Sequence, residues 1–305
     1  MRRAASAAAY LLLVLAAGAA TASNAVTGSG APRIVSLSPH ITELLFAAGA
    51  GARLVGADDA SDYPPEVARL PRVGEAAHVD LEALLRLRPT LVILWDSGTP
   101  PRVRAELERV GLNVLATEQR SLDDIGDVLV QFGALAGTAP AAAEAARRYR
   151  GGLAQLRERY AARARLTAFF QVWDKPLYTV SGKHVISEAL SLCGADNVFA
   201  GLSTLAPLVD REAVLARHPD VILIGAAGSE GQRQAADWER FPSLPAVLNH
   251  HIFAVNSSLV SRMAPRILDG VEEMCSALDQ ARGMAGGPAR GVSIKRQSPD
   301  DTVGR

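Results

Sequence analysis

The sequence is poor in cysteine and has no excess of charge of either sign. Only two of its 305 residues are cysteines, and 32 basic side chains balance 32 acidic ones. No basic block with interleaved aromatic residues occurs, so the electrostatic pattern of a nucleic-acid-binding protein is absent. After the N-terminal apolar stretch there is no run long enough to span a membrane. The chain also lacks GxSxG, HExxH and P-loop motifs.

Residues suited to catalysis or metal binding are scattered. His40 and His184 lie near the starts of corresponding predicted helices, where a polar residue is unremarkable. The loop Asp58–Pro65 carries three carboxylates but has no evident partnering base. We therefore predict no enzyme, no catalytic residue, no cofactor and no protein-held metal, and keep an exported enzyme acting in a cleft as the alternative from another class. The histidines are His40, His78, His184, His218, His250 and His251.

The N-terminus has the form of a secretory signal peptide. Two arginines follow Met1, an apolar stretch comes next, and an Ala-Thr-Ala cleavage site ends at Ala22. A membrane anchor is the alternative, but the dense apolar run is shorter than the ~20 residues of a comfortable span. We expect an exported protein with a flexible lead-in over 23–32 and a disordered tail over 283–305.

The two cysteines, Cys193 and Cys275, both lie in the second half of the chain. An even cysteine count in an exported protein indicates one disulfide. Two free buried thiols are the alternative.

Strands and helices alternate along the chain, which is typical of parallel sheets covered by helices on both faces. The chain is long enough for two domains, each with its own core. Predicted strands span 33–37, 54–57, 91–94, 113–115, 167–172, 221–224 and 252–255. Predicted helices span 40–48, 80–87, 101–110, 121–136, 185–193, 210–217, 235–240 and 265–282.

The stretch from Thr138 to Arg165 predicts one helix of roughly 35–40 Å at 1.5 Å per residue. Its apolar residues recur at a spacing of three or four, and Pro140 suits the first turn. Gly151 and Gly152 weaken its middle by roughly 1 kcal/mol each. It could be a long surface helix within one domain or a spine joining two lobes.

A repeat favours the spine. The segments Val79–Leu85 and Val209–Leu215 share the pattern Val-Asp-x-Glu-Ala, and each precedes a proline at the same spacing and then a buried strand. A second echo pairs Thr42-Glu43 with Ser187-Glu188. Two matches in the same order indicate duplication. We predict two parallel-sheet α/β lobes, 33–137 and 166–282, joined by one long α-helix over 138–165, with a ligand cleft between the lobes.

Ligand-contact candidates come from loops at the carboxyl ends of predicted strands, where parallel sheets bind ligands. Trp95 leaves a strand for a polar turn, Tyr63 lies in the Asp58–Pro65 loop, and Arg262 lies in a loop after the last strand. Local packing of Trp95 and a rigid turn at Tyr63 are the alternatives. Flat aromatics with one arginine suit a bulky planar ligand.

Glu82 and Glu212 occupy the same place in the two copies of the repeat. Each lies in the first turn of a helix, where an acid favours the helix dipole by ~0.3–1 kcal/mol. A functional alternative is a pair of surface carboxylates for a partner with its own twofold axis and basic sockets.

Six segments together resemble the helical-spine class of bacterial ABC-importer substrate-binding proteins, and within it the periplasmic cobalamin-binding proteins. They are RIVSLSPHITELLFAAG, SDYPP, VDLEALLRLRPTLVILW, SGKHVISEALSLCGADNVF, VDREAVLARHPDVILI and SRMAPRI. The resemblance covers about residues 32–282.

The resemblance implies a periplasmic carrier, monomeric when free, that takes cobalamin or a related corrinoid to the permease dimer of an ABC importer. It implies that Glu82 and Glu212 dock on the permease, and that Cys193 and Cys275 form a disulfide within the second lobe. The predicted ligand contacts are Tyr63, Trp95, Trp173, Tyr178, Ser258 and Arg262.

The sequence departs from the cobalamin-binding pattern at three positions. Ala60 stands in place of a Tyr, Ala76 in place of a Trp and Ser258 in place of an acid, so some contacts are missing or moved. A carrier for haem or a ferric siderophore is therefore the alternative, with Tyr63 or Tyr178 as a possible axial ligand to haem. A ligand-sensing module for a membrane receptor is a further alternative.

Overall fold

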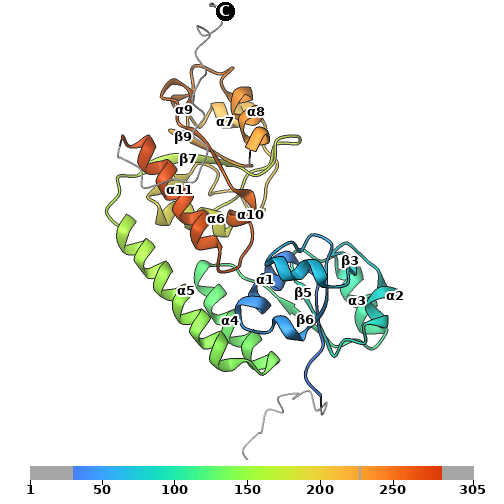
Figure 1. Cartoon of the computed structure of the whole chain (residues 1–305). Helices are drawn as coiled ribbons and strands as arrows, with labels where there is room; N and C mark the ends of the chain where they lie inside the picture. Colours follow the sequence, from blue (N-terminus) through green and yellow to red (C-terminus); the bar gives the residue numbers. More distant parts are fainter. Residues whose placement is uncertain (1–29, 227, 284–305) are drawn as a thin grey trace, which may run out of the picture. The chain divides into compact units, whose positions relative to one another are not determined.

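The computed structural model describes residues 30–226 and 228–283 (Figure 1). The predicted signal peptide, most of the lead-in and all of the predicted tail except Gly283 lie outside these residues. None of the helices described is both long and apolar enough to span a membrane.

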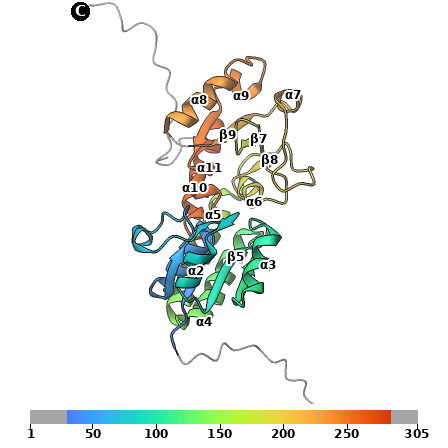
Figure 2. The same ribbon diagram turned by 90° about the vertical axis from the view of Figure 1, so that its right-hand side faces the viewer.

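The N-terminal lobe is a four-stranded parallel sheet with the order β2-β1-β5-β6. Alternate residues of β5 face opposite sides of the sheet: Val92 and Leu94 pack with α2 and α3, whereas Leu91 and Ile93 pack with α1 and α4. The ribbons of β5, α2, α3 and α4 can be followed in Figure 2. The strands are β1 Ile34–Ser36, β2 Leu54–Ala57, β5 Leu91–Trp95 and β6 Val114–Thr117, and β3 Gly74–Glu75 pairs with β4 His78–Val79 in a separate antiparallel ribbon. The helices are α1 Pro39–Ala47, α2 Leu81–Arg86, α3 Pro101–Arg109 and α4 Leu122–Ala136, with short 3₁₀ turns at Gly51–Arg53 and Pro65–Arg69.

The C-terminal lobe repeats this topology with the order β10-β9-β7-β8. In both sheets the first strand of the lobe lies between its second and third, and the fourth lies outside the third. The prediction of two parallel-sheet lobes is confirmed. The strands are β7 Leu166–Gln171, β8 Ala195–Asn197, β9 Val221–Gly225 and β10 Ile252–Val255. The helices are α6 Val185–Leu192, α7 Arg211–Leu215, α8 Gly228–Trp238, α9 Pro245–Leu248, α10 Ser257–Val260 and α11 Ile267–Ala281.

Local capping explains why the repeated segments adopt the same structure. Asp80 accepts a hydrogen bond from the Ala83 backbone N–H at 2.9 Å, and Asp210 accepts one from Ala213 at 2.7 Å. Each aspartate is therefore the N-cap of a short helix, α2 or α7, and satisfies one of its free donors.

Helix α5, Ala139–Tyr160, follows the N-terminal lobe and leads to the C-terminal lobe. The predicted end at Arg165 is wrong, because the chain must become extended before β7. Arg165 instead binds the carboxylate of Asp196, and the next backbone N–H, that of Leu166, donates to Gly194. The helix runs without interruption through both central glycines.

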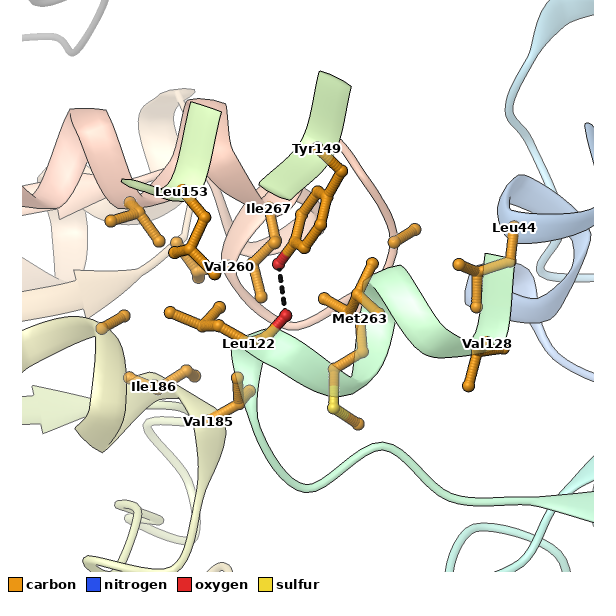
Figure 3. Packing of buried hydrophobic residues seen from close by; sticks show 14 of the residues in the cluster. Leu44, Leu122, Val128, Tyr149, Leu153, Val185, Ile186, Val260, Met263 and Ile267 are labelled. Atoms are coloured by element: carbon orange, nitrogen blue, oxygen red, sulfur yellow. Dashed lines mark hydrogen bonds between the residues drawn. The ribbon is translucent and has the colours of Figure 1, made fainter. Parts of the chain in front are cut away.

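The buried face of α5 belongs to a hydrophobic cluster that contains residues of both lobes (Figure 3). Tyr149, on α5, donates a hydrogen bond to the Leu122 carbonyl of α4 at 2.7 Å, and Leu44 of α1 and Ile267 of α11 belong to the same cluster. The expectation of a separate core for each lobe is therefore wrong for the largest cluster, although each lobe also has a smaller cluster of its own. The buried residues of α5 are Ala142, Ala145, Ala146, Tyr149, Leu153, Leu156 and Tyr160.

Short elements differ most from the sequence prediction. Helix α8 begins at Gly228 instead of Ala235, and α10 replaces a predicted loop. Asn256 explains the start of α10, because its side chain accepts a hydrogen bond from the Ser258 N–H at 3.0 Å. Strand β8, of three residues, and helix α9, of four residues, were not predicted.

Candidate functional site

The first turn of α1 brings several predicted site residues together. It follows the carboxyl end of β1, and Pro39 occupies an early position where a missing N–H costs nothing. His40 and Glu43 lie nearly one turn apart on this helix and are only 5% and 4% exposed. His40 contacts Trp95, and Glu43 contacts Arg262.

His40 and Trp95 form an edge-to-face pair, with ring centroids 5.4 Å apart and planes at 87°. Burial, and secondarily the charge of Arg262, lowers the pKa of His40 to about 4, so its imidazole is neutral at pH 7. Its Nδ1 lies 2.7 Å from the Ser38 hydroxyl, while Nε2 has no hydrogen-bond partner among the described residues. His40 therefore lies in the first turn of α1, as the sequence predicts, and in addition packs against Trp95.

The Trp95 indole is held from two further sides. Its Nε1–H donates to the Glu118 carboxylate at 3.2 Å. Gly98 lies so close that a Cβ there would come within 1.9 Å of the indole ring. A side chain at position 98 would displace the indole, so glycine preserves this orientation.

Glu43 anchors two arginines from the other lobe. Arg266 donates to both carboxylate oxygens, at 2.9 and 2.7 Å, and Arg262 donates to Oε1 at 3.1 Å. Arg262 also pairs with Asp62, and its hydrogen bond lowers the pKa of that carboxyl. The guanidinium of Arg266 lies over the Tyr63 ring, 3.7 Å from its centroid.

The four charges in this cluster cancel, because Glu43 and Asp62 balance Arg262 and Arg266. Trp95 and Arg262 contact the first turn of α1 directly, and Tyr63 is connected to it through Arg266. The cluster thus presents aromatic surface beside a guanidinium whose charge is already compensated.

Three predicted ligand contacts are not part of this cluster. Within 30–226 and 228–283, no hydrogen bond, ion pair or ring contact links Trp173, Tyr178 or Ser258 to it. Trp173 is 62% exposed and donates to the Lys175 carbonyl at 3.1 Å. Tyr178 forms backbone bridges with Trp173 and Leu208, and Ser258 lies in α10.

Glu82 and Glu212 lie in the first turns of α2 and α7, and both are exposed. Glu82 pairs with Arg86 at 2.7 Å, but the two side chains are 83% and 65% exposed. An ion pair this exposed contributes little to stability. Both carboxylates are therefore accessible to a partner.

Sequence reasoning missed Glu43 and Arg266 as site residues, and it found no base for the Asp58–Pro65 loop. The structure supplies two basic partners: Arg262 binds Asp62, and Arg72 donates to the Asp58 and Ser61 carbonyls at 2.7 Å each. The Arg262–Asp62 contact spans 200 residues of sequence, whereas the two Arg72 contacts span only 14 and 11. The signal that could have identified the site was Glu43 itself, the one acid in a mostly apolar helix.

Other candidate sites within the described residues are few. No group of three or more His, Cys, Asp or Glu side chains there could hold a metal ion. A pocket beside α8 and α9 contains none of the predicted site residues, being lined by Ala235, Glu239, Pro242, Val247, Leu248, His250 and Ile252. Cys193 and Cys275 form the predicted disulfide, with Cα atoms 4.8 Å apart.

Comparisons with known proteins agree with this architecture. Residues 34–259 match the family model described as periplasmic binding protein. The vitamin B12-binding protein of Vibrio cholerae serotype O1 is 35% identical over 252 residues, covering 83% of this chain and 91% of the relative. The vitamin B12-binding protein of Vibrio parahaemolyticus is 32% identical over 250 residues, covering 82% of this chain and 90% of that protein.

Solved structures give the same result. The periplasmic vitamin B12 binding protein BtuF of Vibrio cholerae superposes with a TM-score of 0.77 at 35% identity, covering 82% of this chain and 98% of that one. The periplasmic heme-binding protein RhuT from Roseiflexus sp. RS-1, in its apo form, has a TM-score of 0.73 at 26% identity, covering 83% and 99%. The chain therefore belongs to the periplasmic binding protein family, a class of substrate-binding proteins rather than enzymes.

Proposed function

We propose that this protein captures cobalamin or a related corrinoid in the periplasm and delivers it to an ABC importer. Relatives named for vitamin B12 binding match about nine-tenths of their own length, at 91% and 90%. Export follows from the predicted signal peptide, with cleavage after Ala22. The ligand lies between the lobes, where Trp95 and Tyr63 of one lobe and Arg262 of the other converge on α1.

The charge balance around Glu43 carries the choice of ligand. A corrinoid has amide groups around its ring, whereas haem has two carboxylates. Arg262 and Arg266 already bind Glu43 and Asp62, so no unpaired cation in this cluster is free to compensate an incoming dianion. Burying an uncompensated carboxylate is costly, whereas an amide needs only hydrogen bonds. The cluster therefore favours an amide-bearing macrocycle.

Titration of the purified protein with cyanocobalamin and with haemin tests this proposal. Cyanocobalamin should bind one-to-one and quench tryptophan fluorescence, and Trp95→Ala should weaken binding at least ~10-fold. Trp238 is fully buried in the C-terminal lobe, and its unchanged emission in Trp95→Ala would show that folding is intact. Binding of haemin without binding of cyanocobalamin would overturn the corrinoid assignment.

We further propose that Glu82 and Glu212 dock on arginines of the importer's permease dimer, with the free carrier a monomer. Their exposure and their matching positions in the repeat support this role. The double variant Glu82→Ala/Glu212→Ala should abolish corrinoid uptake in cells and leave ligand affinity unchanged. The control Glu106→Ala/Glu158→Ala removes two exposed acids elsewhere and should transport normally. Normal uptake by the first variant would refute docking through these acids.

A further inference from the structure

Glu43 and Glu188 occupy equivalent positions in the two lobes. Each follows a hydroxyl residue in the first helix of its lobe, α1 or α6. The Glu43 side chain is 3% exposed and that of Glu188 is 32% exposed. Both side chains make contacts outside their own lobe.

Glu188 reaches the start of α4 and the spine. Its Oε2 accepts a hydrogen bond from the Leu122 backbone N–H at 2.8 Å, at the first residue of α4. Its Oε1 lies 3.1 Å from Arg157 of α5, which also forms a two-point contact with Asp123 of α4 at 3.0 and 2.7 Å. The C-terminal lobe thus holds the last helix of the N-terminal lobe through Glu188.

Glu43 makes the reciprocal contact. Its main partner, Arg266, is the N-cap residue of α11, and α11 is the last helix of the C-terminal lobe. The two acids therefore make equivalent contacts between the lobes. In each lobe, the glutamate of the first helix binds the start of the other lobe's last helix. Duplication of one lobe explains why the two contacts are equivalent.

The two contacts differ in one respect. Glu43 binds Arg262, a candidate ligand contact, as well as Arg266, whereas Glu188 touches no candidate ligand residue. We propose that both acids are interlobe clasps, that is, carboxylates of one lobe that bind residues outside that lobe and hold the two lobes together. Glu43 is in addition the positioning residue that orients Arg262 toward the ligand. This positioning role rests on the proposed corrinoid-binding function.

The conservative variants Glu43→Gln and Glu188→Gln separate the two roles. Both should lower the folded-to-unfolded ratio in urea, because each leaves an arginine less well paired. Only Glu43→Gln should weaken cyanocobalamin binding, by ~10-fold, since Arg262 then loses its buried anchor. Equal weakening by both variants, or by neither, would overturn the positioning role.

A double-mutant cycle shows whether Glu43 acts through Arg262. In an Arg262→Ala background, Glu43→Gln should cause no further loss of affinity. A full additional ~10-fold loss there would mean that Glu43 affects the ligand by another route. If Glu43→Gln does not fold, Glu43→Asp serves instead: it keeps the negative charge but shortens the side chain by one methylene, so it should weaken cyanocobalamin binding in the wild type and cause no further loss in the Arg262→Ala background.

The clasps can be tested even if cobalamin does not bind. A stability cycle between Glu43→Gln and Arg266→Gln, measured in urea without ligand, should show coupling, and additive losses would refute the clasp. Coupling with no cobalamin binding would leave the clasp standing and remove the proposed function.

Discussion

Removing the Cys193–Cys275 disulfide should destabilise the protein strongly. Cys193 caps the end of α6 and Cys275 lies in α11, and both are fully buried. The bond closes a loop with a sequence separation of 82 residues. In the double variant Cys193→Ala/Cys275→Ala, the unfolded chain regains the conformational freedom that this loop withholds.

The size of the effect follows from the loop length. Loop-closure entropy for a separation of 82 residues corresponds to about 4.5 kcal/mol at 25 °C. Loss of the two buried sulfur atoms adds on the order of 1 kcal/mol. The variant should therefore lose about 4–6 kcal/mol of unfolding free energy, which is a large fraction of the stability of a typical domain.

Urea denaturation followed by tryptophan fluorescence measures this loss. Trp95 reports the N-terminal lobe and Trp238 the C-terminal lobe, so single-tryptophan versions give each lobe its own signal. The hydrophobic cluster shared by both lobes predicts that the two signals change together. Reducing the wild type with dithiothreitol is the matched control, and it should reproduce the loop-entropy part of the loss, because both sulfur atoms remain. A loss below about 1 kcal/mol would refute the loop-entropy argument.

Three further predictions can be checked by the same denaturation experiment. Gly151→Ala should stabilise α5 by about 0.5–1 kcal/mol, and Gly152→Ala should gain less because its Cβ would lie 2.8 Å from Leu268. Tyr149→Phe should cost about 1 kcal/mol by removing its buried hydrogen bond to α4. Because the pKa of His40 is lowered from 6.5 to about 4, its contribution of about 3 kcal/mol should be present above pH 6.5, decline below it and be lost near pH 4. His40→Gln should flatten that pH dependence, and an unchanged slope would contradict the assignment.

Much of the fold could be read from local patterns. The positions of the strands, the capped helices of the repeat and the long central helix depend on residues close in sequence, such as the N-cap residues Asp80 and Asp210. Where the deciding contact was distant, the prediction was wrong. Helix α5 ends at Tyr160, before the chain becomes extended and Arg165 binds Asp196, and α10 is a four-residue helix on an asparagine cap, too short to show periodicity.

The candidate site divides along the same line. Trp95, Tyr63 and Arg262 could be identified from the sequence as candidate ligand contacts, because they lie at strand ends and in polar loops. Their grouping could not be predicted, because it depends on contacts of Glu43 and His40, and the sequence shows these two only as residues of a predicted helix. The partner of Glu43 lies more than 200 residues away, with a sequence separation of 223 for Arg266.

By itself the sequence determined the class of protein, the duplicated lobes and the residue types available to a ligand. The class of protein follows from the resemblance of six segments to a known family, whereas the duplicated lobes and the available residue types follow from periodicity, capping and composition, which act over a few residues. Only the tertiary structure decided that the lobes share a hydrophobic cluster through α5 and are clasped by crossed carboxylates. Those contacts join segments from opposite ends of the chain, and their geometry depends on how two separately formed sheets pack against one helix.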